Sequence, residues 1–186
     1  MALATHGWFL FNSMLVTVYV PFALLDLGLT AFQLGLTLAA AGVGGLLGSL
    51  AAARLGLRWG AGVTVIACRV VMPLSWVLIA LTPSTDAWYV VVLLCVGQFS
   101  YGLSMGAENA NEMGYQQAIT PDALQARMNI TIRSINRAMI VIGAPTGALL
   151  ADGIGYRPTF WIAIVGLLLV VSALAASPFR HARHDE

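Results

Sequence analysis

The stretch GGLLGSLAAARLGLR at residues 44–58 is matched 99 residues further on by GAPTGALLADGIGYR at residues 143–157. Six identities hold the copies in register, namely Gly44 with Gly143, Gly48 with Gly147, Leu50 with Leu149, Ala52 with Ala151, Gly56 with Gly155 and Arg58 with Arg157. Each copy ends an apolar segment. The match predicts two related units in one chain, unless two glycine-rich apolar segments are alike by chance.

The composition around this repeat is that of a membrane protein. Of 186 residues, 59% are hydrophobic and 9% are charged, whereas a soluble domain has about 25% charged residues. This excludes an ordinary cytosolic enzyme and a disordered chain, and a net charge of +1 offers no field to a nucleic acid. The main partner of the chain is therefore the lipid bilayer.

Six apolar segments are long enough to cross a bilayer, which takes about 20 residues each. They lie at about 7–27, 31–53, 60–81, 87–106, 132–151 and 159–176. We expect an all-α, six-helix transmembrane bundle at residues 1–176, with repeat units at about 1–82 and 83–176, and a cytoplasmic tail at 177–186. Thr120 and Pro121 predict the N-cap and the first position of the fifth helix.

Arginine placement predicts the orientation of these spans. One side of the membrane receives Arg54, Arg58, Arg127, Arg133, Arg180 and Arg183. The loops of the other side carry Arg157 alone. The positive-inside rule makes the first side the cytoplasm, so both termini are expected there in a plasma (inner) membrane. The two three-helix units then have opposite orientations, an arrangement typical of transporters.

Glycines at four-residue spacing lie on one face of each repeat copy. Gly44 and Gly48 share a face of the second helix, and Gly143 and Gly147 share a face of the fifth. Bare glycine lets another helix approach closely. The partner is either a helix of the same bundle or a second six-helix body.

Two stretches resemble one known family. SLAAARLGLR at residues 49–58 is similar to the signature loop after the second helix of a half of a major facilitator superfamily transporter, with Arg54, Gly56 and Arg58 kept and Ala53 in place of aspartate. Residues 115–162 resemble the family's drug-exporter branch, which includes macrolide-efflux and enterobactin-exporter-like proteins. The likeness is to a C-terminal half, six helices out of about twelve.

The resemblance implies alternating access by two six-helix bundles, usually coupled to the proton gradient. It implies that the first and fourth helices line the cavity, that the second and fifth face the other half, and that the third and sixth face lipid. Polar and aromatic groups on the first and fourth helices then become substrate candidates, namely Asn12, Tyr19, Gln98, Tyr101 and Asn109. Each serves equally well as a helix-packing hydrogen-bond partner.

Charged residues inside the spans are functional candidates. Arg69 lies roughly 14 Å into the third helix at 1.5 Å per residue, where we expect no acid at the same depth. Its partner is then a backbone carbonyl, Gln98 or a group of an absent half, in either a functional or a tethering role. Asp26, at the end of the first helix, is either a proton-linked carboxylate or an ordinary helix-end residue.

A second charged set lies at the cytoplasmic ends of two helices. Glu108 and Glu112 share a face of the fourth helix, and Arg133 and Arg137 share a face of the fifth. Opposed ion pairs between these helices would form either a gate that breaks on inward opening or a static cluster.

The sequence contains no catalytic constellation, metal-ligand spacing or nucleotide-binding motif. We therefore expect no enzyme, cofactor or metal. Cys68 and Cys95 are read as packing residues. The first hypothesis is a half or truncated secondary transporter that exports small amphiphilic compounds or drugs with a second six-helix half or a homodimer mate. The alternative is a non-transporting remnant or a membrane partner that modulates another protein.

Overall fold

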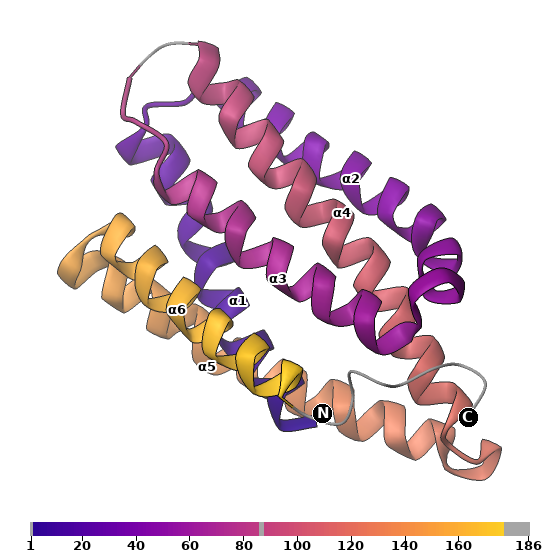
Figure 1. Cartoon of the computed structure of the whole chain (residues 1–186). Helices are drawn as coiled ribbons and strands as arrows, with labels where there is room; N and C mark the ends of the chain where they lie inside the picture. The colour runs from indigo at the N-terminus through magenta and orange to yellow at the C-terminus, as the bar shows by residue number, and fades with distance from the viewer. Residues whose placement is uncertain (1, 86–87, 177–186) are drawn as a thin grey trace.

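The computed structural model describes residues 2–85 and 88–176, and these form long helices without a strand (Figure 1). The helices are α1 (Ala2–Pro21), α2 (Ala31–Trp59), α3 (Ala61–Ala80), α4 (Trp88–Ala118), α5 (Asp122–Ile154) and α6 (Tyr156–Ala175), and a short π-helix, η1 (Phe22–Asp26), continues α1. Six candidate spans among the described residues are long and apolar enough to cross a membrane. The predicted all-α membrane fold is confirmed, and the tail at 177–186 lies outside the described residues.

Two helices are longer than the apolar pattern predicted. The helix α2 continues to Trp59 and α4 continues to Ala118, whereas α5 begins at Asp122, one residue after the predicted first position at Pro121. Arginine and glutamate beyond the apolar stretches are still good helix formers, so α2 and α4 run on past their membrane-crossing parts. The start of α5 also differs, because Pro121 is the N-cap and Thr120 instead donates its hydroxyl to the carbonyl of Gln116, at 2.7 Å.

The two triplets pack as an inverted pair. The most extensive contacts join α2 to α4 and, correspondingly, α5 to α1. The helix α3 packs on α4 as α6 packs on α1, and α3 also contacts α6. Exchanging α1, α2 and α3 for α4, α5 and α6 maps this contact pattern onto itself. The two three-helix units are therefore related in structure by this exchange.

The ends of the two repeat copies do not follow the sequence register. Gly60 ends α2 with φ 82°, and Gly155 ends α5 with φ 92°, a conformation that glycine adopts without steric cost. A threonine hydroxyl bonds back to each glycine carbonyl at 2.8 Å, from Thr64 and Thr159. The structural counterpart of Gly155 is thus Gly60, and the match of Gly56 with Gly155 is a coincidence of sequence.

The repeated glycines pack inside this bundle. A Cβ on Gly44 or Gly48 would collide with the backbone of α4 at Phe99 or Leu103. A Cβ on Gly143 would collide with the carbonyl of Leu10, and one on Gly147 with Met14, both on α1. The sequence left two partners open, a helix of the same bundle and a second six-helix body. The structure shows that these glycines pack against a helix of the same bundle.

An aromatic cluster fills the bundle toward the end where α1 gives way to η1. Trp76 of α3 lies 5.3 Å from Tyr101, 5.9 Å from Tyr19 and 5.8 Å from Phe160, measured between ring centroids. Phe22 adds an edge contact of 5.0 Å to Phe160. These rings join α1, α3, α4, α6 and η1, and such edge and offset contacts add to the stabilisation from area burial.

Candidate functional site

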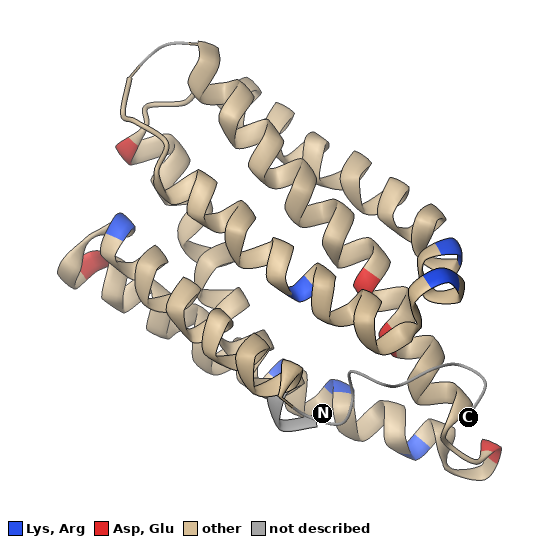
Figure 2. Cartoon of the chain, in the orientation of Figure 1, with Lys and Arg blue, Asp and Glu red and all other residues tan. Residues whose placement is uncertain are grey.

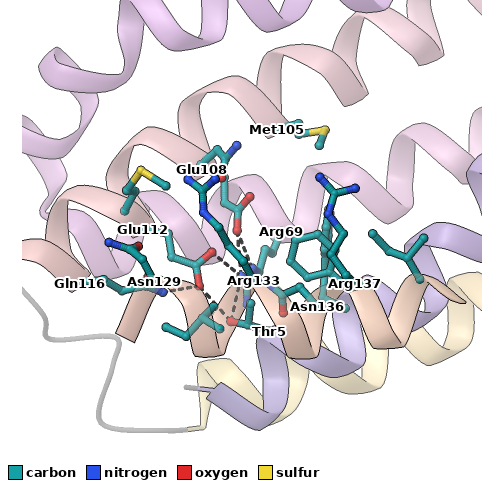
Figure 3. A pocket seen from close by; sticks show the side chains of 16 residues that line it. Thr5, Arg69, Met105, Glu108, Glu112, Gln116, Asn129, Arg133, Asn136 and Arg137 are labelled. Carbon is teal, nitrogen blue, oxygen red and sulfur yellow. Dashed lines mark hydrogen bonds and ion pairs between the residues drawn. The ribbon is translucent and has the colours of Figure 1, made fainter. Parts of the chain in front are cut away.

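A pocket of about 360 Å³ lies between α1, α4 and α5, with α3 at its floor (Figure 3). We call it the charged pocket. Its lining residues are Thr5, Trp8, Phe9, Arg69, Met105, Glu108, Asn109, Glu112, Met113, Gln116, Asn129, Ile132, Arg133, Asn136, Arg137 and Ile140. The set combines ionised groups with apolar and aromatic surface, a composition suited to an amphiphilic ligand.

Arg69 is paired with both acids of α4 at the pocket floor. Its Nη2 lies 2.8 Å from Oε1 of Glu108 and 2.9 Å from Oε2 of Glu112, and its Nε donates to Glu108 at 2.9 Å. Arg69 is 1% exposed and Glu108 is 4% exposed. The expectation that no acid could reach Arg69 is therefore wrong.

Side-chain direction explains this error. Helical side chains lean toward the N-terminus of their own helix. The helices α3 and α4 are consecutive and run in opposite directions, so Arg69 leans toward the acids while Glu108 and Glu112 lean toward Arg69. The side chains therefore meet although their Cα atoms lie at different depths, and the depth of the Cα atoms alone predicts that they stay apart.

Polar neighbours complete the contacts of Glu112. The Thr5 hydroxyl donates to its Oε1 at 2.9 Å, and the amide of Gln116 donates to the same oxygen at 3.3 Å. Thr5 also accepts from Nη2 of Arg69 at 3.3 Å. The buried group of Arg69, Glu108, Glu112 and Thr5, here called the Arg69 cluster, thus ties α1, α3 and α4 together.

Arg133 and Arg137 line the same pocket from α5, and their side chains extend into it (Figure 3). The sequence paired them with Glu108 and Glu112, but in the structure those acids pair with Arg69. Among the described residues, no hydrogen bond or ion pair involves Arg133 or Arg137. The four predicted residues therefore line one pocket, but the two acids pair with Arg69 and not with Arg133 and Arg137.

Comparison with known proteins identifies the family. The family model described as Major Facilitator Superfamily matches residues 1–185. The chain belongs to the Major Facilitator Superfamily. A search of curated proteins found no match. Since this is a transporter superfamily, the chain is a multi-pass membrane protein of transporter type.

The residues of the superfamily's signature loop lie in a helix here. Arg54, Gly56 and Arg58 occupy the last turns of α2, which runs on to Trp59. The backbone leaves the helical conformation only at Gly60, and Arg58 in the last turn interacts favourably with the helix dipole. The predicted loop is therefore corrected to a helix end, with Gly56 buried and both arginines exposed.

Four of the five predicted cavity residues lie in the core instead of the charged pocket. Tyr101 donates to Asn12 at 3.0 Å, and Tyr19 donates to Thr37 at 2.7 Å. Gln98 is 4% exposed. These contacts fit the packing reading, and a role of Asn12, Tyr19 and Gln98 in substrate binding stays a prediction.

Asn109 is the fifth of these residues, and it lies where two pockets meet. It lines the charged pocket and also a second one, of about 590 Å³, between α2 and α4. Tyr101, Met105 and Met113 line the second pocket as well. This side of α4 thus lines both pockets, and the assignment of the fourth helix to a substrate cavity stays a prediction.

Several pocket residues were missed from the sequence. Trp8 is 2% exposed and lines the charged pocket. Asn129 and Asn136 were not singled out, although with Arg133 and Arg137 they recur on one face of α5. A stripe of polar residues at helical spacing inside a predicted span would have identified them.

Arg157 and Asp26 meet near the opposite end of the bundle. Arg157 donates to the carbonyls of Ala80 and Thr82, both at 2.7 Å, and lies 3.6 Å from Oδ2 of Asp26. Its guanidinium also sits 5.3 Å from the Phe22 ring centroid. Asp26 thus has a structural partner. Among the described residues, no group of three or more His, Cys, Asp and Glu side chains could hold a metal ion.

Proposed function

We propose that the chain is one half of a secondary transporter that exports small amphiphilic compounds, including drugs, by alternating access. Transport is coupled to the proton gradient and takes place in the plasma membrane. The chain works with a second six-helix body, which is either the other half of a longer transporter or another copy of itself. The C-terminal-half and drug-exporter likeness of residues 115–162 supports this assignment.

The observation that carries the proposal is the combination of a charged pocket with two uncovered apolar helices. In α2, Leu46 is 62% and Leu50 is 69% exposed, and in α5, Val141 is 71% and Leu149 is 74% exposed. These helices occupy corresponding places in the two triplets. A second body that covers both would also close the open side of the charged pocket along α5.

Charge distribution supports a cytoplasmic location for both termini. Basic positions gather toward the end of the bundle where α4 ends and α5 begins (Figure 2). The positive-inside rule assigns that end to the cytoplasm. Arg133 and Arg137 then guard the cytoplasmic mouth of the pocket, and the Arg69 cluster acts as the gate that rearranges when the pocket opens inward.

Accumulation of a panel of fluorescent dyes and drugs in cells tests the proposal. Cells that express the chain with a candidate second half are expected to accumulate less of at least one compound, and collapse of the proton gradient should abolish the difference. Arg137→Ala should change export without loss of membrane insertion. Arg127→Ala, which removes an exposed arginine of the same helix outside the pocket, is the matched control.

A second candidate is a non-transporting protein that binds another membrane protein through the same faces of α2 and α5. The same exposed leucines favour it, since they need a partner but not a substrate. Unchanged accumulation of every compound, together with stable copurification of a different membrane protein, would establish this candidate and exclude the transporter.

A further inference from the structure

We infer that the charged pocket binds an organic anion, an oxyanion such as a carboxylate or sulfonate joined to an apolar body. This inference rests on the proposed function and names its substrate class. It follows from the hydrogen bonds around the pocket, because the carboxylates already have partners within the chain while several donors have none among the described residues.

The two carboxylates of the pocket and the side-chain oxygen of Asn136 already take part in hydrogen bonds within the chain. Glu108 accepts from two nitrogens of Arg69. Glu112 accepts from Arg69, Thr5 and Gln116. The side-chain oxygen of Asn136 is held at 2.8 Å by Nδ1 of His6, which leaves its amide N–H groups as donors.

Donors remain over. Nη1 of Arg69 and Nε1 of Trp8 are buried and have no hydrogen-bond partner among the described residues. Both residues line the charged pocket, and they are 1% and 2% exposed. A buried donor without a partner is unfavourable, so a ligand acceptor placed against either nitrogen would be bound more tightly.

Charge favours the same class of ligand. The pocket is lined by two carboxylates and three guanidinium groups, and Arg69 is the guanidinium that pairs with both carboxylates. The charges of Arg133 and Arg137 face the pocket without a counter-ion among the described side chains. Phe9, Ile132 and Ile140 supply apolar surface beside them. An anionic head with an apolar body matches both features, whereas a cation would meet the charges of Arg133 and Arg137.

Binding of 8-anilinonaphthalene-1-sulfonate (ANS) to the full chain in phosphatidylcholine nanodiscs tests the inference. The matched probe is N-phenyl-1-naphthylamine, which has the same rings without the sulfonate. Energy transfer from tryptophan reports binding of each probe. We expect saturable ANS binding that Arg133→Gln with Arg137→Gln weakens about tenfold or more, since hydrogen bonds to charged groups are lost. The neutral probe should be insensitive to these substitutions.

The control removes two arginines of the same end that do not line the pocket, by Arg54→Gln with Arg58→Gln, and should leave ANS affinity unchanged. Equal weakening by both pairs, equal sensitivity of the neutral probe, or no saturable ANS binding would overturn the inference. Added phosphatidylglycerol identifies the source of the anion, because displacement of ANS indicates a lipid headgroup and retention indicates a soluble compound. Failure of dye export in cells would leave the binding result standing, so the two proposals fail separately.

Discussion

At the scale of single residues, Arg69 decides the character of the site. A buried guanidinium between two buried carboxylates leaves one negative charge that the cluster does not compensate internally. Arg133 and Arg137 lie across the pocket on another helix, where they can respond to a ligand or to opening of the bundle. The cluster is therefore both a structural tie between three helices and a charged floor.

Arg69→Gln is expected to lower the free energy of unfolding by about 3–5 kcal/mol, because it leaves two buried carboxylates without a cation. Thermal unfolding in detergent measures the effect. Adding Glu108→Gln and Glu112→Gln to the same chain should recover much of the loss. If the triple variant is no more stable than Arg69→Gln alone, the ion pairs are not the cause.

Arg157 has a different role, as a cap on the end of α3. Arg157→Gln should cost about 1–3 kcal/mol, since charge-assisted bonds to two carbonyls are lost while the group is partly exposed. Hydrogen exchange should locate the effect at residues 77–82. An effect spread evenly over all helices would contradict this capping role.

At the scale of the elements, small residues set the distance between helices. Gly44 and Gly48 admit α4 against α2, and Gly143 and Gly147 admit α1 against α5. Gly60 and Gly155 then turn the chain directly into the next helix. Both triplets use glycine for the same two purposes, close approach and reversal.

Gly48→Ala should destabilise the bundle by about 1–3 kcal/mol, because the new Cβ would meet the backbone of Leu103, which cannot move aside. Gly42→Ala on the same helix is the matched control, since nothing lies within 4 Å of its Cβ position. The control should be neutral or slightly stabilising. Equal loss in both variants would mean that helix propensity, not contact, governs the effect.

The elements also show what sequence can and cannot predict here. Six spans, their order and the inverted repeat follow from hydropathy and glycine spacing, which are properties of neighbouring residues. The pairing of Arg69 with Glu108 depends on side-chain direction in two antiparallel helices, and the burial of Trp8 depends on which face α1 turns inward. Such three-dimensional relations have no counterpart in residue spacing.

At the scale of the whole molecule, α2 and α5 are the least covered helices, with 22% and 11% of their most apolar windows buried against 44–56% in the other four described spans. The glycines first considered for a second body are occupied within the bundle, so the outward-facing leucines of these helices are the contact surface to test. Their lengths, 29 and 33 residues, exceed those of α3 and α6. They present extended surfaces on which another bundle could slide or rock.

Single cysteines at Leu50 and Leu149, in a chain with Cys68 and Cys95 replaced by serine, should crosslink to a second body in native membranes. Leu169 on α6 is equally exposed, at 67%, and should not crosslink because the superfamily places the sixth helix toward lipid. Gel mobility of the products distinguishes a second copy from a different protein. Crosslinking at all three positions would show random collision instead of a defined interface.

The single-residue turns at Gly60 and Gly155 restrict how the chain can be rearranged. Neither turn can stretch, so α2 with α3 and α5 with α6 must enter the membrane and move as closed hairpins. A displacement of α2 must therefore carry the start of α3 with it, and a displacement of α5 must carry the start of α6.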